Sequence, residues 1–401
     1  TFFPANLCCC LMIEFLIKLH PEIAIKSKSV RKRQTLLLER NLKTILLQVD
    51  SRVAVSNNFD HLTVRCDSDD EALRQRLIER LQCIPGIVAF AEMQSSRFSS
   101  LHDIFEQVLV VYAAQLEHKS FSVRVRRSGN HDFTSIEAER YIGGGLNQHV
   151  ASARVQLKKP DLVVSLEIKK DLLIMVRQMH QGMGGFPLPS QSDVLSLISG
   201  GYDSAVASYL MIRKGLRTHY LFFNLGGAAH EAGVREMAFH IWQKYSLSHK
   251  VKFVSVNFAP VVDQILETID NGLMGVVLKR MMMRAASSVA ESLGIKAIVT
   301  GESIGQVSSQ TITNLSVIDR VTETLILRPL IYQDKQEIID LARKIGAEDI
   351  AKSMPEYCGV ISKKPTVNAV LSEVLASEQQ FDFSVLEHAV SSAKVLDIRT
   401  I

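Results

Sequence analysis

VLSLISGGYDSAVASYLMIR, residues 194–213, is the stretch that decides the fold. An apolar run ends abruptly in Ser199–Ser204, and an amphipathic run from Ala205 to Lys214 follows, which predicts a buried strand, a tight glycine turn and a helix. Such a turn favours anions, because glycines admit a ligand close to the backbone, serine hydroxyls donate, and the first N–H groups of the helix carry partial positive charge. A plain strand-to-helix turn with a Ser or Asp cap is the alternative, and six residues in this order favour a nucleotide site over it.

The glycine spacing excludes two common phosphate loops. It is neither Gly-x-x-x-x-Gly-Lys-Ser/Thr nor Gly-x-Gly-x-x-Gly. SGGYDS resembles instead the PP-loop of ATP pyrophosphatases, enzymes that cleave ATP to AMP and pyrophosphate while activating an oxygen as its adenylate. The resemblance implies a class of chemistry and leaves the substrate open.

Length and composition set the outer bounds. The 401 residues, 47% hydrophobic and 22% charged, are enough for large cores in about two to four domains. A net charge of +4 permits a polyanionic partner without requiring one. Residues 1–12 look like an extension, and the charges at Glu14 and Lys18 interrupt the apolar start too early for a signal peptide or a membrane span. Cysteines are scattered apart from the adjacent Cys8–Cys10, as expected of a cytoplasmic protein.

Two units with mixed helices and strands are predicted ahead of the loop. Residues 13–95 read strand, helix, strand, strand, helix, strand, which is the order of a ferredoxin-like unit. A second unit, 75–179 with an uncertain and overlapping boundary, includes a helix from Glu137 to Val150 around a break at Gly143–Gly145. Its candidate RNA phosphate contacts are basic residues on one strand and one loop: Arg124, Arg126, Arg127, Lys158 and Lys159. SVRVRRSGNHDFTSIEAERYIGGGLNQ there resembles the THUMP domain, an RNA-binding module of tRNA-modifying enzymes.

After a linker over residues 180–192, apolar strands alternate with helices through residues 193–395. This alternation predicts an α/β fold, a doubly wound parallel sheet that binds ligands at the carboxyl ends of its strands. The turn FFNLGGAAHE (222–231), the helix with Lys279 and the pair Gly301-Glu302 should therefore meet near the loop. Lys279 and its neighbour Arg280 are either phosphate ligands or ordinary basic residues beside an apolar face, and His230 is either an acid–base group or structural. Met281–Met283 are expected to be core.

Taken together, the blocks LISGGYDSAVASYL, FFNLGGAAHE, LKRMMMRAAS, VTGESIGQVSSQT and MPEYCGVISKKPT resemble the tRNA 4-thiouridine synthetase family from Met12 to Ile401. These sulfurtransferases convert uridine 8 of tRNA to 4-thiouridine and also serve thiamine thiazole synthesis. The resemblance implies that ATP adenylates the uridine O4 and that persulfide-level sulfur displaces AMP. It implies ATP contacts at Leu197, Ile198, Ser199, Gly200, Gly201, Ser204, Lys279, Gly301 and Gln310. Asp203 would hold Mg²⁺ or orient the pyrophosphate leaving group.

Cys358 and residues 396–401 bear on how sulfur is delivered. Cys358 matches the PEYCGV cysteine of the family, although a lone cysteine is ordinarily a small buried hydrophobe. Its thiolate would reduce a persulfide donor and form a transient disulfide. Residues 396–401 read as the start of a connector to a rhodanese domain absent from this sequence, so we expect a cysteine desulfurase or another persulfide donor as partner. Transfer to the thiamine sulfur carrier protein is then doubtful, and a homodimer stays open.

The sequence leaves two rival functions open. One is a different PP-loop enzyme that uses ammonia or sulfide, against which the basic THUMP-like unit argues. The other is a tRNA-binding protein without catalysis, against which the intact SGGYDS argues.

Overall fold

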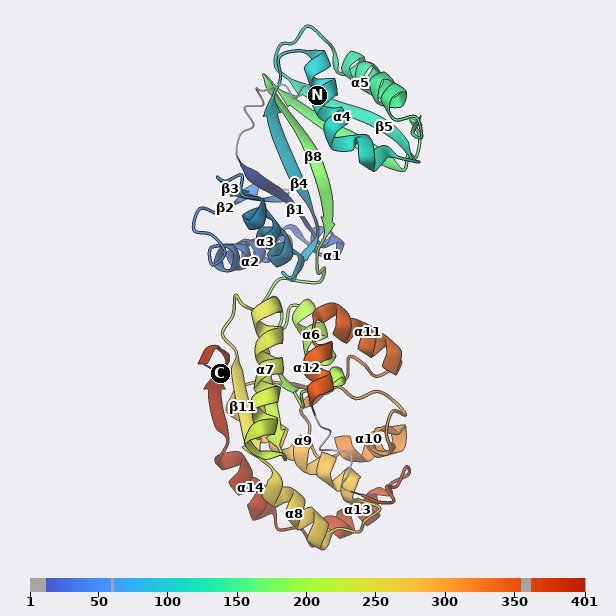
Figure 1. The fold of residues 1–401 in the computed structure, drawn as a ribbon. Helices are drawn as coiled ribbons and strands as arrows, with labels where there is room; N and C mark the ends of the chain where they lie inside the picture. The colour runs from blue at the N-terminus through green and yellow to red at the C-terminus, as the bar shows by residue number, and fades with distance from the viewer. Residues whose placement is uncertain (1–11, 59–60, 355–361, 401) are drawn as a thin grey trace. The chain divides into compact units, whose positions relative to one another are not determined.

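The computed structural model describes residues 12–58, 61–354 and 362–400, and it divides into two compact units (Figure 1). The N-terminal unit holds the described residues up to 82 and residues 87–184. The C-terminal unit holds residues 83–86 and those from 185 on. Across the described ranges, no helix combines the length and the apolar character that crossing a lipid bilayer requires.

The described part of the N-terminal unit is built on one eight-stranded sheet with the order β2-β3-β1-β4-β8-β7-β5-β6. Strand β4 pairs antiparallel with β1 on one side and with β8 on the other, so the two predicted N-terminal domains share this sheet. Its elements are β1 Ile13–Leu19, α1 Pro21–Ala24, α2 Lys28–Leu46, β2 Ala54–Asn58, β3 His61–Cys66, α3 Glu71–Gln82, β4 Ile87–Arg97, α4 Leu101–Leu116, β5 Ser120–Ser128, α5 Ser135–His149, β6 Arg154–Val155, β7 Leu162–Lys169 and β8 Leu172–Gln181.

Helices α4 and α5 pack on the strands of the predicted THUMP-like region through one apolar core (Figure 1). Helix α5 begins at a capping box, in which Thr134 and Glu137 each bond the other's backbone N–H. The break predicted at Gly143–Gly145 is wrong, because α5 runs through all three glycines. A Cβ at Gly145 would lie 2.4 Å from the Phe105 ring, so this glycine lets α4 and α5 approach closely.

The C-terminal unit holds a six-stranded sheet with the order β13-β12-β9-β10-β11-β14 among its described residues. The strands β13 to β11 in this order run parallel, which is the predicted doubly wound arrangement. Two groups of helices pack on it: α6, α7, α11 and α12 contact one another, and α9 contacts α8, α13 and α14 (Figure 1). Its elements are β9 Val194–Leu197, α6 Tyr202–Arg213, β10 Thr218–Asn224, α7 Gly227–Tyr245, β11 Lys252–Asn257, α8 Ala259–Thr268, α9 Met274–Ser292, β12 Ala297–Val299, η1 Ser308–Gln310, α10 Ile312–Asp319, β13 Leu325–Leu327, α11 Lys335–Ile345, α12 Glu348–Ser353, α13 Leu371–Glu378, α14 Phe383–Ser391, β14 Lys394–Asp397 and η2 Ile398–Thr400.

The end of the sheet differs from the sequence-based boundary. Strand β14 pairs antiparallel with β11, and Leu396 lies opposite Phe253. The boundary predicted after residue 395 therefore falls inside a strand, since residues 396 and 397 add to the sheet edge instead of leaving it. Met281–Met283 are buried in the main apolar core, as predicted.

Candidate active site

Residues Ser199–Ser204 form the tight turn between β9 and α6. The Ser204 hydroxyl accepts from the Ser199 N–H at 3.1 Å and donates to the Gly201 carbonyl at 3.1 Å, which closes the turn on itself. Gly200 has a φ of +82°, a conformation that favours glycine, and a Cβ there would lie 2.7 Å from the Met354 side chain. Helix α6 begins at Tyr202, three residues earlier than predicted, and no side chain of the described chain caps it at Gly201. Its first N–H groups are thus left without a side-chain cap among the described residues, an arrangement that favours an anion.

Asp203, in the first turn of α6, is held by side chains from distant parts of the chain. Lys335 Nζ lies 2.9 and 3.1 Å from the two carboxylate oxygens, and Gln306 Nε2 donates to Oδ2 at 2.9 Å. The same ammonium lies 5.7 Å from the centre of the Tyr202 ring. Lys335 is the first residue of α11. The capping box formed by Asp334 and Glu337 starts this helix at the same edge of the sheet. The pairing fixes the carboxylate beside the turn while leaving a quarter of its side-chain surface exposed.

Gly301, which follows β12, packs directly on the loop. A Cβ there would lie 2.7 Å from the Asp203 carbonyl carbon and 2.8 Å from the Ser204 nitrogen. The next residue, Glu302, is buried and accepts hydrogen bonds from Arg328 and from the Thr300 hydroxyl, each at 2.9 Å. Lys279 Nζ lies 4.0 Å from the Glu302 carboxylate, so α9 brings its lysine to the same strand end.

The remaining predicted nucleotide contacts lie on two neighbouring segments. Ile198 is buried, and its N–H donates to the Leu221 carbonyl oxygen at 2.9 Å. Ile198 therefore extends strand β9 beyond Leu197, which is half-buried. Gln310 closes the 3₁₀ turn η1, and its Oε1 accepts from the Ser303 N–H at 3.3 Å. Arg280 is different, because it is 1% exposed and paired with Glu378, so it is a core residue and not a phosphate ligand.

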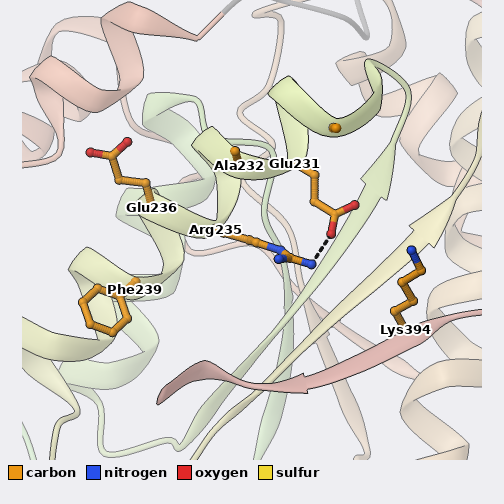
Figure 2. A pocket seen from close by; sticks show the side chains of 7 residues that line it. Glu231, Ala232, Arg235, Glu236, Phe239 and Lys394 are labelled. Carbon is orange, nitrogen blue, oxygen red and sulfur yellow. Dashed lines mark hydrogen bonds and ion pairs between the residues drawn. The ribbon is translucent and has the colours of Figure 1, made fainter. Parts of the chain in front are cut away.

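The start of α7 presents two polar side chains in different environments. His230 is buried, and burial lowers the pKa of its imidazole although a hydrogen bond with the Ser199 backbone opposes the shift. Glu231 lines a hollow of about 610 Å³ together with Arg235, Phe239 and Lys394 of β14 (Figure 2). Glu231 also accepts from Asn224 at 3.0 Å, so this hollow begins at the carboxyl end of β10. His230 therefore supports the turn, whereas Glu231 lines the hollow.

The described residues contain no cluster of three or more His, Cys, Asp or Glu side chains arranged for a metal ion. Mg²⁺ in nucleotide sites commonly has one or two carboxylate ligands, and phosphates and water supply the rest. The chemistry of Asp203 fits that role, since it is a partly exposed carboxylate in the first turn of α6. Cys358 lies outside the described residues.

The predicted RNA contacts of the N-terminal unit are largely at its surface. Arg124 and Arg126 are exposed and alternate along β5 with the buried Val123 and Val125. Arg124 lies 3.6 Å from Glu139. Arg127 Nη1 donates to the Gly129 carbonyl oxygen at 3.1 Å and lies 3.0 Å from His131 Nδ1. Lys158 and Lys159 are both exposed.

Three family models match the sequence. They are described as thiamine biosynthesis protein (ThiI) over residues 189–383, THUMP domain over 98–176 and ThiI ferredoxin-like domain over 14–91. Over 389 residues the chain is 62% identical to a tRNA sulfurtransferase of Tolumonas auensis, 57% to one of Colwellia psychrerythraea and 57% to one of Haemophilus influenzae. Each alignment covers 97% of this chain and 80% of the relative.

The chain belongs to the tRNA sulfurtransferase family. Solved structures confirm the fold class: a crystal structure of a 4-thiouridine synthetase in complex with RNA and bound ATP covers 96% of this chain and 99% of its own, with a TM-score of 0.79 and 23% identity. A Pyrococcus horikoshii protein covers 83% of this chain and 99% of its own, with a TM-score of 0.58 and 17% identity. At these identities the two likenesses establish the fold alone.

Sequence reasoning missed several side chains that shape the site of this sulfurtransferase family member. Gln306 was included only within the block VTGESIGQVSSQT, and Lys335 and Arg328 were not predicted at all. The capping-box pattern at 334–337 was the available signal for Lys335, because it marks a helix start. Nothing local in the sequence shows that this helix start lies against Asp203.

Proposed function

We propose that this chain catalyses the ATP-dependent replacement of a uridine 4-oxygen in tRNA by sulfur, giving 4-thiouridine. The observation that carries the proposal is the turn at Ser199–Ser204, which presents backbone N–H groups at the end of a parallel strand in a chain 62% identical to a tRNA sulfurtransferase.

The reaction needs an activated oxygen. The uridine O4 attacks the α-phosphate of ATP, an O–P bond forms, and pyrophosphate leaves. The N3 proton is lost in this step. Hydrosulfide then forms a bond to C4, the C4–O bond breaks with AMP as the leaving group, and the S–H proton moves to N3, which gives the 4-thiocarbonyl. Adenylation is needed because an oxygen bound to phosphate leaves far more readily than one bound only to the ring.

Different residues would bind different parts of the nucleotide. Ile198 and Leu197 would contact the adenosine part from the strand end, and the turn would bind the phosphates. Lys279 reaches the same strand end and is exposed by about a quarter, so its ammonium can move from Glu302 to a phosphate. Asp203 would hold Mg²⁺, which supplies positive charge to the phosphates when it is bound.

The sulfur source lies outside the described geometry. A persulfide donor such as a cysteine desulfurase is the proposed partner. Thiolate attack by Cys358 on the donor persulfide would release sulfide and leave a disulfide, a balanced exchange. The family description as a thiamine biosynthesis protein favours a second candidate, sulfur transfer to the thiamine sulfur carrier protein.

The test is a reconstitution with purified chain, ATP, Mg²⁺, sulfide and unmodified tRNA, followed by mass spectrometry of the digested tRNA. We expect 4-thiouridine from the wild type and a loss of at least about 100-fold in Asp203→Ala, because a misplaced or missing phosphate-site group has effects of this size. Asp340→Ala removes an exposed carboxylate of α11 and should leave the yield unchanged. Absence of product from the wild type, or full activity in Asp203→Ala, would contradict the proposal.

A further inference from the structure

The segment Ser362–Ala369, which reads SKKPTVNA, is neither helix nor strand and is nevertheless firmly attached to the C-terminal unit. Asn271 provides the first attachment: its Oδ1 accepts the backbone N–H of Lys363 at 3.0 Å and that of Lys364 at 3.1 Å. The Thr366 N–H donates to the Gly272 carbonyl at 2.9 Å. The backbone beneath the two lysines is therefore fixed against the loop that precedes α9.

Asn314 provides the second attachment and is completely buried. Its Nδ2 donates to the Thr366 carbonyl at 2.8 Å and to the Ser308 carbonyl at 2.7 Å, and its Oδ1 accepts from the Ala369 N–H at 2.8 Å. Ser308 begins the turn η1 that ends in Gln310, a predicted ATP contact. One buried amide thus ties the lysine segment to the nucleotide end of the sheet.

Most side chains on this fixed backbone are exposed, although Ala369 is buried. Lys363 and Lys364 are exposed, and neither has an ion pair among the described residues. Val367 is 59% exposed, and its carbonyl accepts from the Thr311 hydroxyl at 2.8 Å, which brings it next to Ile312, 69% exposed. Two cations and two aliphatic side chains therefore form an exposed patch beside the turn that contains Gln310: Lys363, Lys364, Val367 and Ile312.

We infer that Lys363 and Lys364 bind phosphates of the tRNA strand adjacent to the target uridine, while Val367 and Ile312 contact its sugars or bases. The inference rests on the proposed function and names a second RNA surface in addition to the basic strand of the N-terminal unit. Two lysines that have no carboxylate partner in the described part of the chain suit a polyanion, and phosphate contacts of this kind position a strand without reading its sequence. The neighbouring aliphatic side chains favour RNA over the triphosphate of ATP, because they match base and sugar surfaces and not phosphate.

The experiment compares the full chain with Lys363→Ala/Lys364→Ala. Its matched control is Lys250→Ala/Lys296→Ala, which removes two exposed lysines that precede β11 and β12, at the opposite ends of the parallel strands. Binding of unmodified tRNA is measured by fluorescence anisotropy over a series of salt concentrations. We expect the slope of log Kd against log salt to fall by about 1.4–1.8, since each lost phosphate contact contributes roughly 0.7–0.9. The control should keep the wild-type slope, and Lys363→Arg/Lys364→Arg should restore it.

Turnover measurements distinguish tRNA from the other ligands that this surface could bind. We expect kcat/KM for tRNA to fall at least tenfold in the alanine variant, with the KM for ATP unchanged. A raised KM for ATP with unchanged tRNA binding would overturn the inference in favour of the ATP phosphates. A loss seen only with a persulfide-donor protein, and not with free sulfide, would overturn it in favour of a protein docking surface. Unchanged binding and turnover would also overturn it, whereas an inactive wild type would refute the proposed function and leave the salt slope to decide this inference.

Discussion

Replacing Gly301 by alanine tests the close packing of β12 on the nucleotide loop. The added Cβ would lie 2.7 Å from the Asp203 carbonyl carbon, 2.8 Å from the Ser204 nitrogen and 2.9 Å from the Asp203 carbonyl oxygen. All three atoms belong to the backbone of the first turn of α6, so no side chain can rotate away. Non-bonded carbon atoms prefer separations of roughly 3.5–4.0 Å, and the strand end or the loop must therefore shift by about 1 Å.

That shift has two calculable consequences. Overpacking of this kind costs about 1–3 kcal/mol, and in a unit of this size each kcal/mol lowers Tm by roughly 2–4 °C. A displacement of about 1 Å at reacting groups lowers turnover by roughly 100-fold. We therefore expect Gly301→Ala to lose both stability and 4-thiouridine formation, with the larger effect on activity.

The assay for stability is thermal unfolding followed by fluorescence of Trp242, the single tryptophan of the sequence, which lies in the C-terminal unit. Gly275→Ala is the matched control, because α9 leaves open space around that position and a Cβ there meets no atom within 4 Å. This control should keep its activity and unfold at the wild-type temperature or slightly above it. A Gly301→Ala variant that kept wild-type activity and Tm would refute the packing argument.

Two further predictions concern buried ionisable side chains of the same unit. Glu378→Ala leaves the guanidinium of Arg280 buried without its carboxylate, so we expect about 3–5 kcal/mol less unfolding free energy in urea titrations, largely recovered in Arg280→Met/Glu378→Leu. Burial lowers the pKa of His219 below its ordinary 6.5, and its contact with Asp193 opposes that shift only in part. The folded state therefore binds this proton less readily than the unfolded state, and stability that is present above pH 6.5 should fall as the pH decreases below it. His219→Gln should reduce the slope of unfolding free energy against pH by up to about 1.4 kcal/mol per pH unit, and an unchanged slope would contradict this assignment.

The main strands and helices could be predicted because their apolar patterns are local. The run from residue 194 marks β9, and the glycines at 200 and 201 mark its end. Periodicity could not locate the start of α6, because Gly201 occupies the N-cap and gives no side-chain signal. Periodicity also predicted a helix break at Gly143–Gly145, which is wrong. Gly145 is accounted for by the Phe105 ring of another helix, because a Cβ at Gly145 would collide with that ring.

The candidate site was predictable only where one segment carries its own chemistry. The loop and the carboxyl ends of β10 and β12 follow from the rule that parallel strands bind ligands at that edge. Lys335 is different, because its ammonium reaches Asp203 from a helix 132 positions later in the chain. The edge strand β14 is similar, since four residues with no strong pattern become a strand only by pairing with β11.

The charge balance around the loop explains why a divalent cation is expected with ATP. The charged side chains that contact one another there are three cations and three carboxylates among the described residues: Lys279, Arg328, Lys335, Asp203, Glu302 and Asp319. Because these charges cancel, they leave no excess positive charge for a triphosphate. The N–H groups of α6 supply only about half a charge, which is far less than ATP carries. We therefore expect an added cation to accompany the nucleotide, with Asp203 as the carboxylate that binds it.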